Sequence, residues 1–186
     1  MAKKDITDKT LTKEGKLSGD EYDNCHFVNC QLGEAKLSGK VFTDCTFEGC
    51  DLSNAKTEET AFTNVTFKNC KLLGVHFEHC RSFLFDVKFK GCNLELATFR
   101  DRKMKSTDFK KCKLIETDFT GADLRESTFN GCDMDRAVFE RTDLRKVDFR
   151  NSYGYRLSPE DNRVRGAKFS QAGLAGLLTD YGIVVD

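Results

Sequence analysis

Large apolar residues recur at every fifth position along most of this chain of 186 residues. In the stretch FKKCKLIETDFTGADL, residues 109–124, they are Phe109, Leu114, Phe119 and Leu124. A helix repeats every 3.6 residues and a strand every 2, so neither element can place residues five apart on one face throughout. The backbone must therefore change direction within each five-residue unit.

The series of large residues begins at Tyr22, shifts by two residues within EHCRSFLFD (78–86), and ends at Phe149. Thr57 is its one member that is not apolar. Large apolar side chains favour burial, so we expect the whole series to point inward. Its members are Tyr22, Phe27, Leu32, Leu37, Phe42, Phe47, Leu52, Thr57, Phe62, Phe67, Leu72, Phe77, Leu84, Phe89, Leu94, Phe99, Met104, Phe109, Leu114, Phe119, Leu124, Phe129, Met134, Phe139, Leu144 and Phe149.

Each large residue has characteristic neighbours two positions away on either side. The residue two before it is small, as at Ala35 and Cys45. The residue two after it is mostly Asn or Gly in the first half, and these types tolerate the positive φ of a type II turn. In the middle of the chain we expect a different turn type, because the same place is taken by Leu96, Ser106, Lys111 and Glu116.

Every twentieth residue is of the same kind, which indicates four five-residue units per turn of a coil. Coils stacked at about 4.8 Å would pair their backbones with the coils on either side. The sequence thus predicts an all-β solenoid of about six and a half regular coils. Rings that stack within it would add about 0.5–1.5 kcal/mol per pair beyond burial. The predicted core stack is Phe27, Phe47, Phe67, Phe89, Phe109, Phe129, Phe149, Leu32, Leu52, Leu72, Leu94 and Leu114.

Six of the nine cysteines share one column of small residues. No CxxC cluster typical of a metal site is present. Stacked parallel Cβ vectors would stay near the coil spacing, beyond the roughly 3.8 Å typical of a disulfide. We therefore expect buried free thiols that fill space in a reducing compartment. The column is Cys30, Cys50, Cys70, Cys92, Cys112 and Cys132.

Composition divides the chain into three parts: residues 1–19 as an N-terminal cap or disordered segment, 20–149 as the repeat with its slip near 78–84, and 150–186 as a loop, a last coil and a tail. The tail predicts a short amphipathic helix, with Ser170 as its N-cap and Gly182 as its stop. Gly173 and Gly176 would each cost a helix about 1 kcal/mol relative to Ala, which predicts close packing of another group there. That group is either the last coil, with the tail as a lid, or a second copy of the chain. The candidate dimer residues are Leu174, Leu177, Leu178, Tyr181 and Ile183.

Charge and motifs exclude several classes of function. Thirty basic and thirty acidic residues balance, so we expect no direct nucleic-acid or membrane partner. The start MAKKDITDKT lacks the apolar core of a secretory signal, which predicts a cytoplasmic protein. No phosphate loop, nucleophile–base pair or metal motif stands out, so we expect no enzyme, no metal and no cofactor.

The small residue, polar residue, large residue and two polar residues of Ala122-Asp123-Leu124-Arg125-Glu126 resemble the repeat of the pentapeptide repeat family. The resemblance covers about residues 20–149 and implies a right-handed quadrilateral β-helix. The end of the chain, LLTDYGIVV (177–185), is similar to the tail of the quinolone-resistance pentapeptide proteins, which implies a capping helix through which two copies form a homodimer.

This resemblance implies a DNA mimic that binds and modulates or protects a type II topoisomerase, DNA gyrase or topoisomerase IV. The neutral charge fits a mimic poorly, and a cytoplasmic scaffold for some other protein partner is the alternative. Two runs of charge are candidate partner surfaces, the acidic one for mimicry and the basic one for an acidic partner. Their residues are Asp118, Asp123, Asp133, Asp135, Arg100, Arg102, Lys103 and Lys105.

Overall fold

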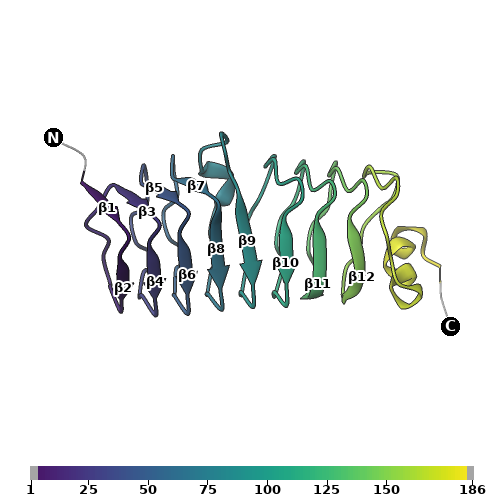
Figure 1. The fold of residues 1–186 in the computed structure, drawn as a ribbon. Coiled ribbons are helices and arrows are strands. Elements are labelled where there is room, and N and C mark those ends of the chain that lie inside the picture. Colours follow the sequence, from purple (N-terminus) through teal and green to yellow (C-terminus); the bar gives the residue numbers. More distant parts are fainter. Residues whose placement is uncertain (1–3, 184–186) are drawn as a thin grey trace.

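The chain winds into a rod of stacked coils in the computed structural model, which describes residues 4–183 (Figure 1). The strands are short, and each pairs in parallel with the equivalent strand of the next coil. They are β1 Asp5–Thr7, β2 Thr10–Thr12, β3 Glu21–Asp23, β4 His26–Val28, β5 Val41–Thr43, β6 Thr46–Glu48, β7 Ala61–Thr63, β8 Val65–Lys68, β9 Val87–Lys90, β10 Asp108–Lys110, β11 Thr128–Asp133 and β12 Asp148–Tyr153. Three 3₁₀ helices accompany them: η1 Phe77–His79, η2 Gln171–Leu177 and η3 Thr179–Tyr181.

Two sheets follow neighbouring faces of the rod. One has four strands in the order β1-β3-β5-β7, and the other has eight in the order β12-β11-β10-β9-β8-β6-β4-β2. Isolated parallel bridges, such as Gln31 to Asp51 and Lys36 to Lys56, join the coils elsewhere. The register advances by 20 residues, as from Phe27 to Phe47. The predicted all-β, right-handed quadrilateral β-helix is confirmed.

Aromatic rings fill the interior in two stacked columns. In one column Phe27 stacks on Phe47 with ring centroids 4.3 Å apart, and the stacking continues through Phe149 to Phe169. The neighbouring column, which contains Phe99 and Phe119, meets the first edge to face. Most rings therefore have stacked neighbours above and below and a perpendicular neighbour beside them, which are the two favourable geometries for aromatic pairs.

The corner of nearly every repeat lies at the residue two after the large one, where the backbone has a left-handed φ of about 50–75°. His79 and Asn151 are exceptions. The expected different turn type in the middle of the chain is wrong, because Leu96 (φ 58°), Ser106 (φ 60°) and Glu116 (φ 53°) adopt this conformation too. The Leu96 N–H donates to the carbonyl of Ile115 on the next coil, at 3.0 Å. Backbone hydrogen bonds between coils fix the corner, and they impose a left-handed φ on residue types that do not favour it.

The described part of segment 1–19 forms a coil of its own. β1 pairs Ile6 with Tyr22, and β2 pairs Leu11 with Phe27. Leu17 is buried beneath the next coil. The segment expected as a cap or as disordered chain thus continues the solenoid by one turn from residue 4 onward.

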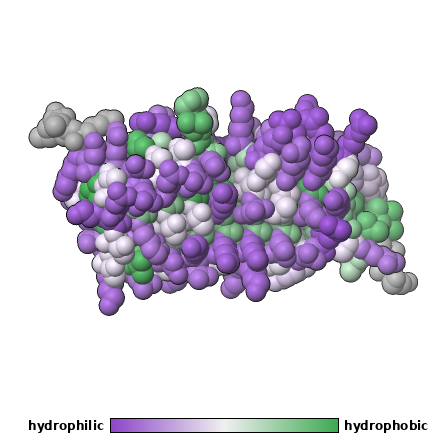
Figure 2. Space-filling view, in the orientation of Figure 1, coloured by the Kyte–Doolittle hydropathy of each residue, from purple (hydrophilic) through white to green (hydrophobic). Residues whose placement is uncertain are grey.

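The slip is a two-residue insertion, since β8 and β9 pair Val65 with Val87 and Phe67 with Phe89. Leu84, which we expected to point inward, is 59% exposed at a φ of 56°, and Phe85 takes the inward place. Phe83 beside it is 80% exposed. The tight turn of η1 ends at Cys80 and leaves the extra residues as a projection near β8 and β9, which Figure 2 shows as an apolar protrusion.

The C-terminal segment folds over the last coil as η2 and η3. The Ser170 hydroxyl caps η2 by accepting a hydrogen bond from the Gly173 N–H at 3.2 Å, and Gly182 ends η3 with a left-handed φ of 63°. The expected short helix is thus present, as two consecutive 3₁₀ helices. Val184 and Val185, at the end of the predicted tail, lie outside the described residues. Within residues 4–183 no helix combines the length and apolarity needed to cross a bilayer.

Candidate functional site: the lateral faces and the C-terminal end

The interior of the rod leaves no room for a ligand. Rings, leucines and thiols occupy it along its whole described length. Among residues 4–183, no group of three or more His, Cys, Asp or Glu side chains is placed to hold a metal ion. Any function that depends on recognition must use the outer faces or the two ends.

The predicted thiol column lies in the core, and all nine cysteines are buried and free. The Cys50 thiol donates to the Phe27 carbonyl and the Cys70 thiol to the Phe47 carbonyl, both at 3.4 Å, and Cys92 and Cys132 repeat the contact. Burial raises the pKa of Cys45 and of Cys80 to about 12. Cys45 and Cys80, which lie outside the column, are therefore protonated and poor nucleophiles. All nine thiols are enclosed and act as packing groups.

Arginines neutralise two of the four acidic candidates within the chain. Asp118 is buried and accepts hydrogen bonds from the Thr120 N–H at 2.8 Å and from Nε of Arg100, on the preceding coil, at 2.5 Å. Asp123 is held by both donors of the Arg125 fork at 2.7 and 2.6 Å.

Asp133 and Asp135 are partly exposed and lie two residues apart. The Asp133 carboxylate accepts a hydrogen bond from the Asp135 N–H at 3.2 Å, and Asp135 approaches Arg136 Nε at 3.8 Å. The four candidates therefore do not form a continuous free acidic stripe.

An Asp-x-Arg motif, which the sequence analysis missed, explains the neutralisation of Asp123 and recurs at two further sites. In Asp143-Leu144-Arg145 the outer residues flank an inward leucine, so both point outward and the guanidinium reaches the carboxylate at 2.6 Å. Asp148-Phe149-Arg150 repeats the arrangement at 2.7 Å. The hydrogen bonds from the Arg145 and Arg150 side chains lower the pKa of Asp143 and Asp148 below the ordinary value, although partial burial opposes them.

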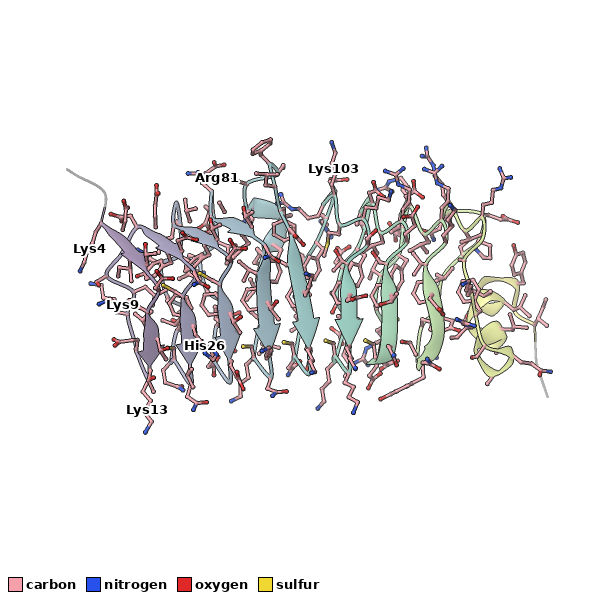
Figure 3. All side chains as sticks on the ribbon, in the orientation of Figure 1. Lys4, Lys9, Lys13, His26, Arg81 and Lys103 are labelled. Carbon is pink, nitrogen blue, oxygen red and sulfur yellow. The ribbon has the colours of Figure 1, made fainter. Side chains whose placement is uncertain are left out.

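The predicted basic run is distributed over different environments. Arg100 pairs with Asp118, and Lys105 approaches Glu126 at 3.4 Å. Lys103 is exposed at the edge of the rod (Figure 3). Arg102 is only 4% exposed and cannot contact a partner.

Arg102 instead holds the inserted residues in place. Its guanidinium donates to the carbonyls of Cys80 and Arg81 at 2.8 and 2.6 Å, and to the Ser82 hydroxyl at 3.2 Å. It also lies 4.4 Å above the Phe85 ring. Arg102 occupies a position that in most repeats holds a small residue, and a long basic side chain there, one coil after the insertion, was the available sequence signal.

Three lysines that the sequence analysis did not single out lie side by side on the eight-stranded sheet. Lys68 of β8 pairs in register with Lys90 of β9, and Lys90 with Lys110 of β10. Lys90 and Lys110 are exposed and Lys68 is partly so. Within the described residues none of the three has a carboxylate within 4.0 Å. Their alignment was predictable only once the two-residue slip had been placed.

The C-terminal end exposes apolar side chains. Leu174, Tyr181 and Ile183 are 47%, 51% and 55% exposed, whereas Leu177 and Leu178 are partly covered. Figure 2 shows this end as an apolar surface. A Cβ at Gly173 would overlap the Tyr155 hydroxyl, and one at Gly176 would overlap the Tyr155 carbonyl oxygen. The predicted close packing at the glycines is therefore made by the chain's own Tyr155.

Comparison with known proteins gives a family match. A family model described as "Pentapeptide repeat region" matches residues 40–111 and 102–178. A solved structure of trypsin-treated QnrB1, a plasmid-mediated fluoroquinolone resistance protein, is 19% identical with a TM-score of 0.63 and covers 99% of this chain and 98% of its own. HetL, a pentapeptide repeat protein from the cyanobacterium Nostoc sp. strain PCC 7120, is 19% identical with a TM-score of 0.38, over 88% and 84% of the two chains. No curated protein matches the sequence significantly.

Proposed function

This chain belongs to the pentapeptide repeat family, and from that premise we propose that it is a non-catalytic binding protein that acts on a protein partner through the outside of its rod. One observation carries the proposal. The core is filled by stacked rings and buried thiols, while the chain's unneutralised groups lie on the lateral faces and at the C-terminal end. Such a rigid surface can present charges and apolar groups at fixed spacing, which suits recognition of a partner.

A type II topoisomerase, DNA gyrase or topoisomerase IV, is the first partner to test. QnrB1, whose fold is similar, is a fluoroquinolone resistance protein. The pairing of Asp118 and Asp123 with arginines argues against recognition by simple DNA mimicry, because a mimic needs free carboxylates at its surface. A scaffold for another protein is the second candidate, and the mixed signs along the rod favour it.

A supercoiling assay separates the two candidates. Purified protein is titrated into a gyrase reaction with and without a fluoroquinolone, at several salt concentrations. Inhibition, or restored supercoiling in the presence of drug, would support the topoisomerase. No effect up to tens of micromolar, where an interaction of about −6 kcal/mol would be visible, would reject it. In-cell cross-linking would then test for another protein partner, and recovery of none would contradict the proposed function.

We propose further that two copies associate through their C-terminal ends. Leu174, Tyr181 and Ile183 expose apolar surface there, and a two-fold axis would bury the same patch on both copies. Light scattering during size-exclusion chromatography should give the mass of a dimer for the wild type and of a monomer for Leu174→Asp with Ile183→Asp. A monomeric wild type would reject the dimer. A cytoplasmic location is proposed on the nine free thiols, which fit a reducing compartment.

A further inference from the structure

The lysine column, which we define as Lys68, Lys90 and Lys110, is electrostatically unfavourable in the isolated chain. The three residues share one outward register position on β8, β9 and β10, which lie side by side in the middle of the rod (Figure 1). Like charges directly opposite on adjacent strands destabilise a sheet. Here three such positions follow one another at the coil spacing of about 4.8 Å.

The remaining surroundings of the lysine column hold more positive than negative charge, with Asp108 as the one carboxylate on this face of β9 and β10. Lys88 is exposed on the same face of β9, and Lys111 and Lys113 are exposed immediately after β10. In the register of this face, Glu48 of β6 lies before Lys68, and Asn130 of β11 lies after Lys110. The column is thus a bounded patch of three coils in a chain whose formal net charge is zero.

Several outward arginines are neutralised within the chain, whereas the lysines of the column are not. Arg125, Arg145 and Arg150 each bind an aspartate two residues earlier at 2.6–2.7 Å. Among the described residues no carboxylate lies within 4.0 Å of Lys68, Lys90 or Lys110. An external group with matching negative charge would relieve the repulsion and complete the pattern.

The dimensions of the lysine column fit one face of an acidic helix. Two coil intervals span about 10 Å, and residues i to i+7 of a helix also span about 10 Å at 1.5 Å per residue. Helix side chains at i and i+4 have Cβ atoms about 5–6 Å apart, close to the spacing of the coils. Duplex DNA fits less well, because it carries one charge per roughly 1.7 Å of its axis and would extend far beyond three coils, past Glu48.

We propose that the lysine column binds an acidic helix of a protein partner, whose carboxylates at i, i+4 and i+7 lie along the rod axis. The proposal rests on the proposed function, since it names the partner class that one lateral face recognises. Exposed charge pairs of this kind contribute modest affinity and faster, salt-dependent association, so apolar contacts elsewhere on the rod would supply the remaining affinity.

A pair of labelled peptides tests the lysine column directly. Both are capped, alanine-based helices with three glutamates, placed at i, i+4 and i+7 in one and spread over three faces in the other. Fluorescence anisotropy at low salt should show that the wild type binds the first peptide more tightly. Binding should weaken between about 50 and 200 mM salt.

Matched variants locate the site. Lys68→Gln with Lys90→Gln and Lys110→Gln should lower affinity about tenfold, the sum expected for three exposed pairs. Lys9→Gln with Lys103→Gln and Lys168→Gln makes the same charge change at exposed lysines of three separated coils and should leave the affinity within about twofold. Far-UV circular dichroism and melting curves would establish that both variants are folded.

Any of three outcomes would overturn the proposal that the lysine column binds an acidic helix. These are equal affinity for both peptides, an equal loss of affinity in the control variant, or tighter binding of a 20-base-pair DNA duplex than of the peptide with aligned glutamates. The supercoiling and cross-linking assays judge the proposed function separately. If the triple lysine variant keeps full activity in those assays, the lysine column is not the partner site, but the proposed function stands. If the chain binds the peptide but shows no partner in either assay, the proposed function is rejected and the binding site stands.

Discussion

The Phe109 ring stacks on the Phe129 ring, with centroids 4.7 Å apart and planes within 7° of parallel. The same Phe109 ring meets Phe119 of the adjoining column edge to face at 5.8 Å. Each interior ring thus belongs to a continuous lattice, and removing one ring leaves a void that the rigid coils on either side cannot close.

Phe109→Ala should therefore destabilise the fold by about 3–5 kcal/mol, the usual cost of a buried phenylalanine in a core that cannot collapse. Urea unfolding followed by circular dichroism measures the change. Phe83→Ala is the matched control, because Phe83 is 80% exposed and its loss should change the free energy of unfolding by less than about 0.5 kcal/mol. An equal change in the free energy of unfolding for both variants would contradict the importance of the stacked interior rings.

The five-residue period was sufficient to predict the coils because burial of every fifth residue admits few other backbones. It also located the slip, whose register the pairing of Phe67 with Phe89 establishes. The corners in the middle of the chain could not be predicted from residue type. Leu96 and Glu116 have no preference for a left-handed φ, and bonds between coils impose it on them.

Surface features were less predictable, because they depend on residues twenty apart. The neutralisation of Asp143 by Arg145 follows from a local spacing and could have been found. The lysine column appears only when the slip is placed, since Lys68 and Lys90 are 22 residues apart rather than 20. The role of Arg102 could not be predicted, because it depends on the direction of the Cys80 and Arg81 carbonyl groups in the inserted loop.

Arg102→Met should loosen the inserted loop. Methionine fills the buried volume but donates no hydrogen bond, so the carbonyls of Cys80 and Arg81 lose their partners at about 1–3 kcal/mol per buried group. Trypsin should then cleave after Arg81 much faster than in the wild type, as mass spectrometry of the fragments would show. Lys103→Met is the control at an exposed neighbour and should leave cleavage after Arg81 unchanged. If trypsin cleaves Arg102→Met no faster than the wild type, the inserted loop does not depend on Arg102 for its order.

The thiol column predicts very slow modification of the native protein. All nine cysteines are buried, so the reagent cannot reach them in the folded chain. For Cys45 and Cys80, which lie outside the column, burial also raises the pKa to about 12, which leaves almost no thiolate at pH 8. Ellman's reagent should react with none of them on the time scale of minutes in buffer and with all nine in guanidinium chloride. A fast native thiol would show that one coil opens locally.

Stability should fall as the pH is lowered below about 4, the ordinary pKa of aspartate. The bound arginine lowers the folded-state pKa of Asp123 and Asp143, so their contribution is complete above the unfolded value and is lost as the pH falls through the folded one. Urea unfolding between pH 7 and pH 3 would measure this loss. Asp143→Asn should reduce the dependence on pH, and Arg145→Gln should reduce it in the same way by removing the partner. An unchanged slope in both variants would assign the acid sensitivity to other groups.

The C-terminal cap should depend on the absence of side chains at two glycines. A Cβ at Gly176 would overlap the Tyr155 carbonyl oxygen, which is backbone and cannot rotate away. Gly176→Ala should therefore displace η2, break the hydrogen bond from the Leu157 N–H to the Gly176 carbonyl, and cost about 1–3 kcal/mol as overpacking does. Gly33→Ala is the control, since its nearest neighbour would be the Ser53 carbonyl oxygen at 3.8 Å. Hydrogen exchange should rise in η2 and the last coil of Gly176→Ala alone. If the tail instead stays protected and the variant loses only the dimer mass, the glycine would serve the contact between copies rather than the contact with Tyr155.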